Sequence, residues 1–168
     1  MRKFMKANWR IVFAALALCA VFVLVGCERK NFNDNGADIE AMANALVQAA
    51  KENDAEETRR LIEEDVDVNA IDDKGKTALM FATEKNSVDV AKILIAAGAN
   101  INAKENEYGE TALMYAAAQN ALDVAKLLIE AGTNINAKNY GGKTALMLAE
   151  ENDAADVIEL LKVAGTKE

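Results

Sequence analysis

Apolar residues recur in the same order along most of this chain. A threonine precedes a short apolar segment, an Asn or Asp follows, and then come apolar residues spaced i, i+3 and i+4. This spacing places the apolar side chains on one side of an α-helix. The pattern therefore predicts pairs of helices, and the second helix of each pair carries one of these stripes: Val90, Ile93, Leu94; Val124, Leu127, Leu128; Val157, Leu160, Leu161.

A hexapeptide marks the start of each pair. Residues 75–80 read Gly-Lys-Thr-Ala-Leu-Met, and the counterparts of Gly75 are Gly109 and Gly142, 34 and then 33 residues further along. Threonine is favoured at helix N-caps, so Thr77, Thr111 and Thr144 are expected to begin helices. A fixed period of this size indicates a stacked array, whose function lies on a long repeated surface and not in a single deep pocket.

Turn-forming residues separate the predicted helices. The residues between the two helices of a pair tolerate the left-handed conformation that ends a helix: Asn86, Asn120, Asp153. Glycines stand where the second helix of each pair should end, a position that favours glycine: Gly98, Gly132, Gly165.

Each unit resembles the ankyrin repeat. The T-A-L-M-x-A of this chain corresponds to the family's T-P-L-H-x-A, and residues 98–103 and 132–137 correspond to its G-A-D-V-N-A. Ala replaces the family's Pro, and Met replaces its His. The resemblance implies an all-α solenoid of stacked helix-turn-helix units with hairpin-like loops. Because alanine is a strong helix former, the fold expectation holds, and loss of the histidine's hydrogen bonds predicts modest stability.

Four units account for residues 38–168. Leu46 and Leu61 keep the apolar register upstream of the first marked copy, which predicts a degenerate first unit. The expected units are 38–70, 71–104, 105–137 and 138–168. Polar residues replace apolar ones at both ends of the array, Glu57 and Arg60 in the first unit and Lys162 in the last. A terminal repeat lacks one neighbour, so these substitutions predict caps.

The first 26 residues differ from the rest of the chain. A basic start precedes the apolar run 11–25, as in a secretory signal, and the run is shorter than the about 20 apolar residues of a typical membrane span. Leu-Val-Gly26-Cys27 ends this region. The sequence resembles the bacterial lipobox, which implies cleavage between Gly26 and Cys27 and acylation of Cys27. The alternatives are an uncleaved N-terminal helix in the inner membrane and a cleaved signal that releases a soluble domain.

Residues 27–37 are polar and aperiodic, which predicts a flexible tether. Several acyl chains anchor a protein stably where one does so only marginally, so a tri-acylated Cys27 would hold this protein on a bilayer. In the lipoprotein families that the chain resembles, the residue after the cysteine influences sorting, and Glu28 is not the Asp associated with inner-membrane retention. The expected location is the bacterial cell envelope, with the outer membrane favoured.

The composition argues against catalysis and nucleic-acid binding. Histidine, the commonest general base and metal ligand at neutral pH, is absent from the sequence. The chain has 19 basic and 27 acidic residues, and four of the basic ones lie within residues 1–26. The remaining acidic domain is unsuited to phosphate contacts. We expect no enzymatic activity, no cofactor or metal, no nucleic-acid partner and no small-molecule substrate.

If the units stack as ankyrin repeats do, the hairpin tips and the exposed side of each first helix line a concave groove. Tyr108 and Tyr140 are the foremost candidates for partner binding, because tyrosine is enriched among interface anchors. The alternative is that each ring packs across its own turn. The expected partner-binding residues are Asp73, Lys74, Lys76, Glu84, Lys85, Glu107, Tyr108, Glu110, Gln119, Tyr140, Lys143, Glu151 and Asn152, with Lys51 and Glu52 in the first unit.

The second hairpin, which includes residues 104–108, is one residue longer than the others. An insertion in a repeat array maps to a loop on one face, often the binding face, although tolerated drift would produce it as well. Phe81, Tyr115 and Leu148 share one position in the repeat, and we expect them to pack half-buried in preference to contacting a partner.

The sequence thus predicts a membrane-anchored lipoprotein whose ankyrin-like array binds another protein in the bacterial envelope. Its acidic charge predicts a partner with a basic face and binding that weakens with salt. Two alternatives remain. One is an inhibitory or stress-protective module that occupies an enzyme's active face, and the other is a structural spacer or surface antigen without a single partner.

Overall fold

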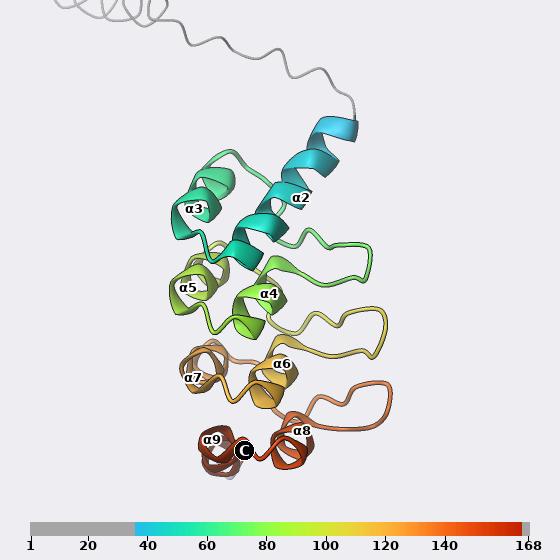
Figure 1. Ribbon diagram of the computed structural model, residues 1–168, viewed down its shortest axis with the longest axis vertical. Coiled ribbons are helices and arrows are strands. Elements are labelled where there is room, and N and C mark those ends of the chain that lie inside the picture. Colours follow the sequence, from blue (N-terminus) through green and yellow to red (C-terminus); the bar gives the residue numbers. More distant parts are fainter. Residues whose placement is uncertain (1–35, 166–168) are drawn as a thin grey trace, which may run out of the picture. The chain divides into compact units, whose positions relative to one another are not determined.

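The computed structural model describes residues 36–165, and these contain eight helices in four pairs (Figure 1). Residues 1–35 and 166–168 lie outside the described part, including the predicted signal and Cys27. The expected all-α solenoid is confirmed for the described part. The pairs are α2 (Gly36–Glu52) and α3 (Ala55–Glu63), α4 (Ala78–Glu84) and α5 (Val88–Ala96), α6 (Ala112–Ala118) and α7 (Leu122–Glu130), and α8 (Ala145–Glu151) and α9 (Ala155–Gly165).

The four pairs stack in two rows. The first helices of the pairs form one row, the second helices form the other, and three loops project on the side of the first row (Figure 1). Within each row, every helix contacts the equivalent helix of the next unit. An isolated antiparallel bridge between Ile71 and Thr77 closes the base of the first loop.

The repeated threonines begin the first helix of their units, as expected. The Oγ1 atoms of Thr77 and Thr144 accept hydrogen bonds from the N–H groups of Met80, at 3.3 Å, and Met147, at 3.4 Å. Thr111 occupies the same N-cap position before α6 without this side-chain bond. The threonine therefore marks the helix start in all three units, and its hydroxyl satisfies an otherwise unpaired N–H group in two of them.

The turn residues adopt the expected conformations with one exception. Asn86, Asn120 and Asp153 have φ values of 52°, 50° and 53°, and Gly98 and Gly132 have 90° and 85°. Positive φ is a conformation that asparagine tolerates and glycine adopts without strain.

Gly165 is the exception, because it ends α9 without a positive φ. A positive φ at this position turns the chain toward the hairpin of the next unit, and the described part of the last unit makes no such turn. In the first unit, Asp65 takes the equivalent position with a φ of 62°. This position of the repeat therefore does not require glycine.

The core consists of apolar faces pressed between successive units. Met80 and Met114, which replace the family's histidine, are each 1% exposed, whereas Met147 in the last unit is 48% exposed because no described unit covers it. Phe81 and Leu148 are buried to 8% exposure and Tyr115 is half-buried, in line with their expected packing role.

The first unit differs from the other three at its start. Helix α2 begins at Gly36, so it includes two residues that the sequence pattern assigned to the tether, Gly36 and Ala37. Asn44, which aligns with the capping threonines, lies inside this helix and not at its start. No hairpin precedes α2 within the described residues, so the helix continues upstream of the position where the other first helices begin.

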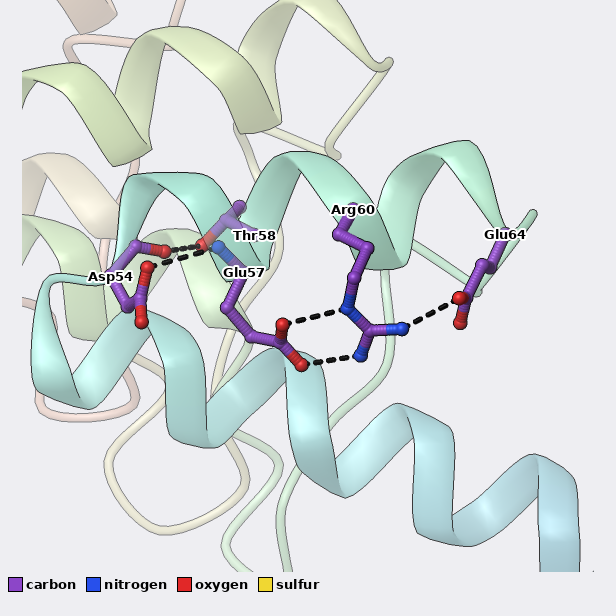
Figure 2. Close-up of polar contacts among 5 residues, drawn as sticks. All are labelled: Asp54, Glu57, Thr58, Arg60 and Glu64. Atoms are coloured by element: carbon purple, nitrogen blue, oxygen red, sulfur yellow. Dashed lines mark hydrogen bonds and ion pairs between the residues drawn. The ribbon is translucent and has the colours of Figure 1, made fainter.

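The polar residues predicted to cap the first unit form an ion-pair cluster on α3 (Figure 2). The Arg60 guanidinium donates two hydrogen bonds to the Glu57 carboxylate, at 2.5 and 2.7 Å, and one to Glu64, at 2.6 Å. The bonds from Arg60 hold the pKa of Glu57 below its ordinary value. All three side chains are well exposed, so the cluster contributes solubility more than stability.

Asparagine side chains tie successive units together. The Asn69 Oδ1 atom accepts from the Asn100 N–H at 2.7 Å, and the Asn102 Oδ1 atom accepts from the Asn134 N–H at 2.8 Å and the Thr133 hydroxyl at 3.2 Å. By contrast, the Asn100 side chain accepts from the N–H of Asn102 within its own turn. The second asparagine of the Asn-Ile-Asn phrase therefore connects units, and the first shapes the turn.

Replacing Asn102 by alanine should lower the free energy of unfolding by about 1–2 kcal/mol, because it leaves two donors of the next unit without their partner. Urea unfolding followed by circular dichroism measures the loss. The control is Asn100→Ala, which removes a bond inside one turn and should cost about 0.5 kcal/mol. Equal losses in the two variants would show that the connection between units is energetically unimportant.

Candidate functional site

The three projecting loops are fingers of the same construction. We define finger 1 as residues 72–76, finger 2 as residues 105–110 and finger 3 as residues 139–143. In each, the N–H of the first residue donates to the carbonyl of the last: Asp72 to Lys76 at 3.0 Å, Glu105 to Glu110 at 3.1 Å, and Asn139 to Lys143 at 2.9 Å. The fingers are therefore closed turns with defined tips.

The first side chain of each finger braces the loop from inside. The Asp72 Oδ1 atom accepts from the N–H groups of Lys74, at 3.0 Å, and Lys76, at 2.9 Å, and the Asn139 Oδ1 atom accepts from Lys143 N–H at 2.9 Å. The corresponding residue in finger 2, Glu105, has a side chain longer by one methylene group, and this finger is longer by one residue. The longer side chain of Glu105 thus reaches the backbone N–H groups of a finger that has one more residue.

Glu105 is the residue that sequence reasoning missed. The residue is 2% exposed, and its carboxylate accepts from the N–H groups of Glu107 at 2.5 Å, Tyr108 at 2.6 Å and Glu110 at 3.1 Å. Burial alone would raise the pKa of this carboxyl, but the backbone donors of finger 2 together hold it below its ordinary value. A signal was present in the sequence, because every finger begins with Asp, Glu or Asn.

The fingers also bond to one another. The Asn106 N–H donates to the Lys74 carbonyl at 2.9 Å, and the Tyr140 N–H donates to the Tyr108 carbonyl at 2.8 Å. The Tyr140 ring lies against Gly109 so closely that a Cβ atom there would be 2.6 Å from the ring. Tyr140 therefore packs on the neighbouring finger and not across its own turn, yet 67% of it remains exposed.

A pocket of about 280 Å³ is lined by residues of fingers 2 and 3 and by Leu148 of α8. It brings together five of the predicted partner-binding residues, and among them Tyr108 is 57% exposed. We call it the finger 2–3 pocket. Its lining residues are Glu107, Tyr108, Glu110, Asn139, Tyr140, Gly141, Lys143 and Leu148.

Lysines in the first and third fingers are engaged by acids of their own units. Lys76 Nζ lies 2.8 Å from a Glu84 carboxylate oxygen, and Lys143 Nζ lies 2.7 Å from one of Glu151. Unit 105–137 has Glu110 and Ala118 at the equivalent positions, so it has a glutamate in place of the lysine and no acid to pair with it. Burial, reinforced by the charge of Glu105, raises the pKa of Glu110 against the opposing effects of Asn139, Lys76 and Lys143.

Lys76 is less available to a partner than the sequence suggested. Its side chain is 15% exposed, and its Nζ atom lies 4.7 Å from the Phe81 ring centroid and 4.3 Å from that of Tyr115. The Lys51 Nζ atom, from the preceding helix of this row, lies 4.3 Å from the centroid of the same Phe81 ring. The two lysines thus contact the rings of Phe81 and Tyr115, and these cation–ring contacts connect α2, finger 1, α4 and α6.

The other predicted residues lie outside the pocket. Lys74 forms a 3.8 Å ion pair with Glu107, and Glu84 and Glu151 hold the two lysines described above. The following are exposed on the tips or on first-row helices: Glu52, Asp73, Lys74, Lys85, Gln119, Glu151 and Asn152. The pocket thus contains five of the thirteen residues predicted in the last three units, and the other eight are distributed over the tips and the first-row helices.

Two further properties of residues 36–165 bear on other functions. No group of three or more Cys, Asp or Glu residues in this part of the chain could hold a metal ion. No helix there is long and apolar enough to cross a membrane.

This chain matches the model of one protein family and is similar in sequence to parts of larger proteins. The family model described as "Ankyrin repeats (3 copies)" matches residues 11–105 and 102–167. Human (Homo sapiens) mitochondrial disaggregase is 37% identical over 91 residues, which are 53% of this chain and 12% of that protein. Neurogenic locus notch homolog protein 1 of Mus musculus is 47% identical over 47 residues, 28% of this chain and 2% of that protein. The chain therefore spans a small part of each relative.

Replacing Glu105 by glutamine should lower the free energy of unfolding at neutral pH by about 2–3 kcal/mol, because the amide turns an N–H group toward backbone donors and removes charge-assisted bonds. A lowered pKa contributes stability above the ordinary value of 4.5, and this stability is lost as the pH falls through the lowered pKa. The difference between the two proteins should therefore shrink in acid.

Urea unfolding across the acidic range measures this difference. The control is Glu107→Gln in the same finger, whose exposed carboxylate should change the free energy of unfolding by less than about 0.5 kcal/mol. A Glu105→Gln protein as stable as the wild type would refute the bracing role of this carboxylate.

Proposed function

Because this chain belongs to the ankyrin-repeat family, we propose that residues 38–168 are a protein-interaction module that an acylated Cys27 holds on a bacterial envelope membrane. The finger 2–3 pocket carries the proposal of binding, because two mostly exposed tyrosines line it from neighbouring fingers that are hydrogen-bonded to each other. Ankyrin repeats typically serve as interaction modules without catalytic activity, so the fingers and first-row helices are the surface that a partner protein would contact.

The tyrosines supply the apolar area, and their surroundings supply a polar rim. The Tyr140 N–H donates a hydrogen bond to the Tyr108 carbonyl, and the Tyr108 N–H donates one to the buried carboxylate of Glu105. A rigid aromatic anchor loses little side-chain entropy on binding, and interface hot spots are enriched in tyrosine. The exposed acids and amides around the pocket fit the rim of such an interface.

The charge of the module supports a partner with a basic face. Residues 36–165 contain 12 Lys and Arg residues and 24 Asp and Glu residues. An excess of acid attracts positively charged partners, and this attraction weakens as salt screens it. The same excess disfavours nucleic acids as partners.

The anchor is proposed from residues 1–27. The basic start, the apolar run 11–25 and the small Gly26 before Cys27 agree with a lipoprotein signal. The short tether after Cys27 would keep the array close to the bilayer, and Glu28 favours the outer membrane. The chain's attachment to that membrane would then depend on Cys27 alone.

Replacing both Tyr108 and Tyr140 by alanine should abolish capture of the partner when the full chain is crosslinked in its own envelope. The loss of two anchors corresponds to at least about 2 kcal/mol, or roughly thirtyfold in affinity. Affinity purification and mass spectrometry measure it. The control is Lys92→Ala with Lys126→Ala, which changes exposed residues of second-row helices. Unchanged capture would remove the pocket from the function and favour a spacer.

Replacing Cys27 by serine should eliminate incorporation of radiolabelled palmitate and move the protein from the membrane to the soluble fraction, since several acyl chains provide the anchor. Globomycin should cause the uncleaved precursor to accumulate. The control is Cys19→Ser, because Leu18 precedes that cysteine and does not fit the lipobox. A Cys27→Ser protein that stays in the membrane would instead support an uncleaved N-terminal helix.

A further inference from the structure

Two tyrosines and two glutamates line the finger 2–3 pocket. Tyr108 and Tyr140 come from neighbouring fingers, and Glu107 and Glu110 come from finger 2. Aromatic ring faces attract cations, and carboxylates accept their hydrogen bonds. The pocket therefore combines the two groups that recognise a positively charged side chain.

Lys143, the lysine that lines the pocket, already forms an ion pair with a glutamate of its own unit. Lys143 is bonded to Glu151 at 2.7 Å, and the nearby Lys76 is bonded to Glu84 at 2.8 Å. Glu110 occupies the position of these lysines in unit 105–137, and Ala118 occupies the position of their glutamate partners. Its side chain bonds to the neutral Asn139. A negative charge thus faces the pocket without a lysine of its own unit.

The surroundings of Glu110 favour the entry of a cation. Burial and the charge of Glu105 raise the pKa of Glu110, whereas Lys76 and Lys143 act in the opposite direction. The raised pKa means that the ionised form of Glu110 is under-stabilised in the free protein. A cation beside it would relieve the repulsion between Glu105 and Glu110.

We propose that the finger 2–3 pocket takes the guanidinium group of an arginine in an exposed segment of the partner protein. The inference rests on the proposed interaction function and names the group that the pocket recognises. A guanidinium is planar, stacks on aromatic rings and presents its N–H donors as a fork that matches a carboxylate, which a lysine ammonium does not. A volume of about 280 Å³ suits a single side chain better than a larger ligand.

The chain offers a direct spectroscopic test, because two of its three tyrosines line the pocket and the third does not. Tyr108 and Tyr140 line the pocket, and Tyr115 does not. The full chain, labelled with 3-fluorotyrosine and held in detergent micelles, should give one ¹⁹F resonance for each, assigned with Tyr→Phe variants. The probes are acetyl-Gly-Arg-Gly-amide, the same peptide with uncharged citrulline in place of arginine, and the same peptide with lysine.

The arginine peptide should shift the resonances of Tyr108 and Tyr140 in a saturable way and affect Tyr115 least. Compared with the arginine peptide, the citrulline peptide should bind at least about tenfold more weakly, and the lysine peptide at least about threefold more weakly. Glu110→Gln should weaken arginine binding by about tenfold. The matched control is Glu130→Gln, an equal change of charge on the exposed side of α7.

Three outcomes would overturn the inference. They are equal shifts with arginine and citrulline, equal binding of arginine and lysine, and unchanged binding by the Glu110→Gln protein. If the arginine peptide fails while the Tyr108→Ala, Tyr140→Ala protein loses its partner, the inference falls and the proposed function stands. If the peptide binds while capture of the partner is unchanged by the tyrosine variants, the proposed function falls instead.

Discussion

Burial of each unit's apolar face against the next unit is the interaction on which the rest of the structure depends. No unit of this size can bury its helices alone, so stability comes from the contacts between neighbours. The methionine series shows this directly, since Met80 and Met114 are buried between units and Met147, at the end of the described stack, is 48% exposed. At the other end, Arg60 with Glu57 and Glu64 provides a solvated surface where the inner units have apolar residues.

Stacking also sets the positions of the fingers, because each finger connects the second helix of one packed pair to the first helix of the next. Hydrogen bonds that each later finger donates to the preceding one, and the bond that Asn102 accepts from the Asn134 N–H, keep the tips in register. The buried carboxylate of Glu105 lets finger 2 hold one additional residue without losing its backbone bonds. The insertion therefore changes the shape of the tip and leaves the scaffold intact, as a binding surface on a repeat scaffold requires.

The candidate site arises from differences between equivalent positions. Where finger 1 and finger 3 carry Lys76 and Lys143, each paired with a glutamate, finger 2 carries Glu110 opposite Ala118. Where Asn106 packs on Gly75 of finger 1, the equivalent contact one unit further along places the Tyr140 ring on Gly109. Fingers with similar backbones thus carry different side chains along the array. The pocket lies where Glu110, which has no lysine partner in its own unit, is close to Tyr108 and Tyr140.

The period, the helix pairs, the capping threonines and the left-handed turns at Asn86, Asn120 and Asp153 could be predicted from the sequence, because they depend on local backbone preference and on which residues avoid water. The sequence also identified Tyr108 and Tyr140 as exposed at the tips. Local pattern was insufficient at the ends of the array, where Asn44 lies within α2 and Gly165 needs no positive φ, since the neighbouring unit that imposes those features is missing from the described stack.

Three features could be seen only in the folded chain: the burial of Glu105, the packing of Tyr140 on the preceding finger, and the contacts of Lys76 with Glu84 and two aromatic rings. Each of these depends on distances between side chains that the fold brings together, which spacing along one unit does not encode. The pocket between fingers 2 and 3 is a property of the stack for the same reason.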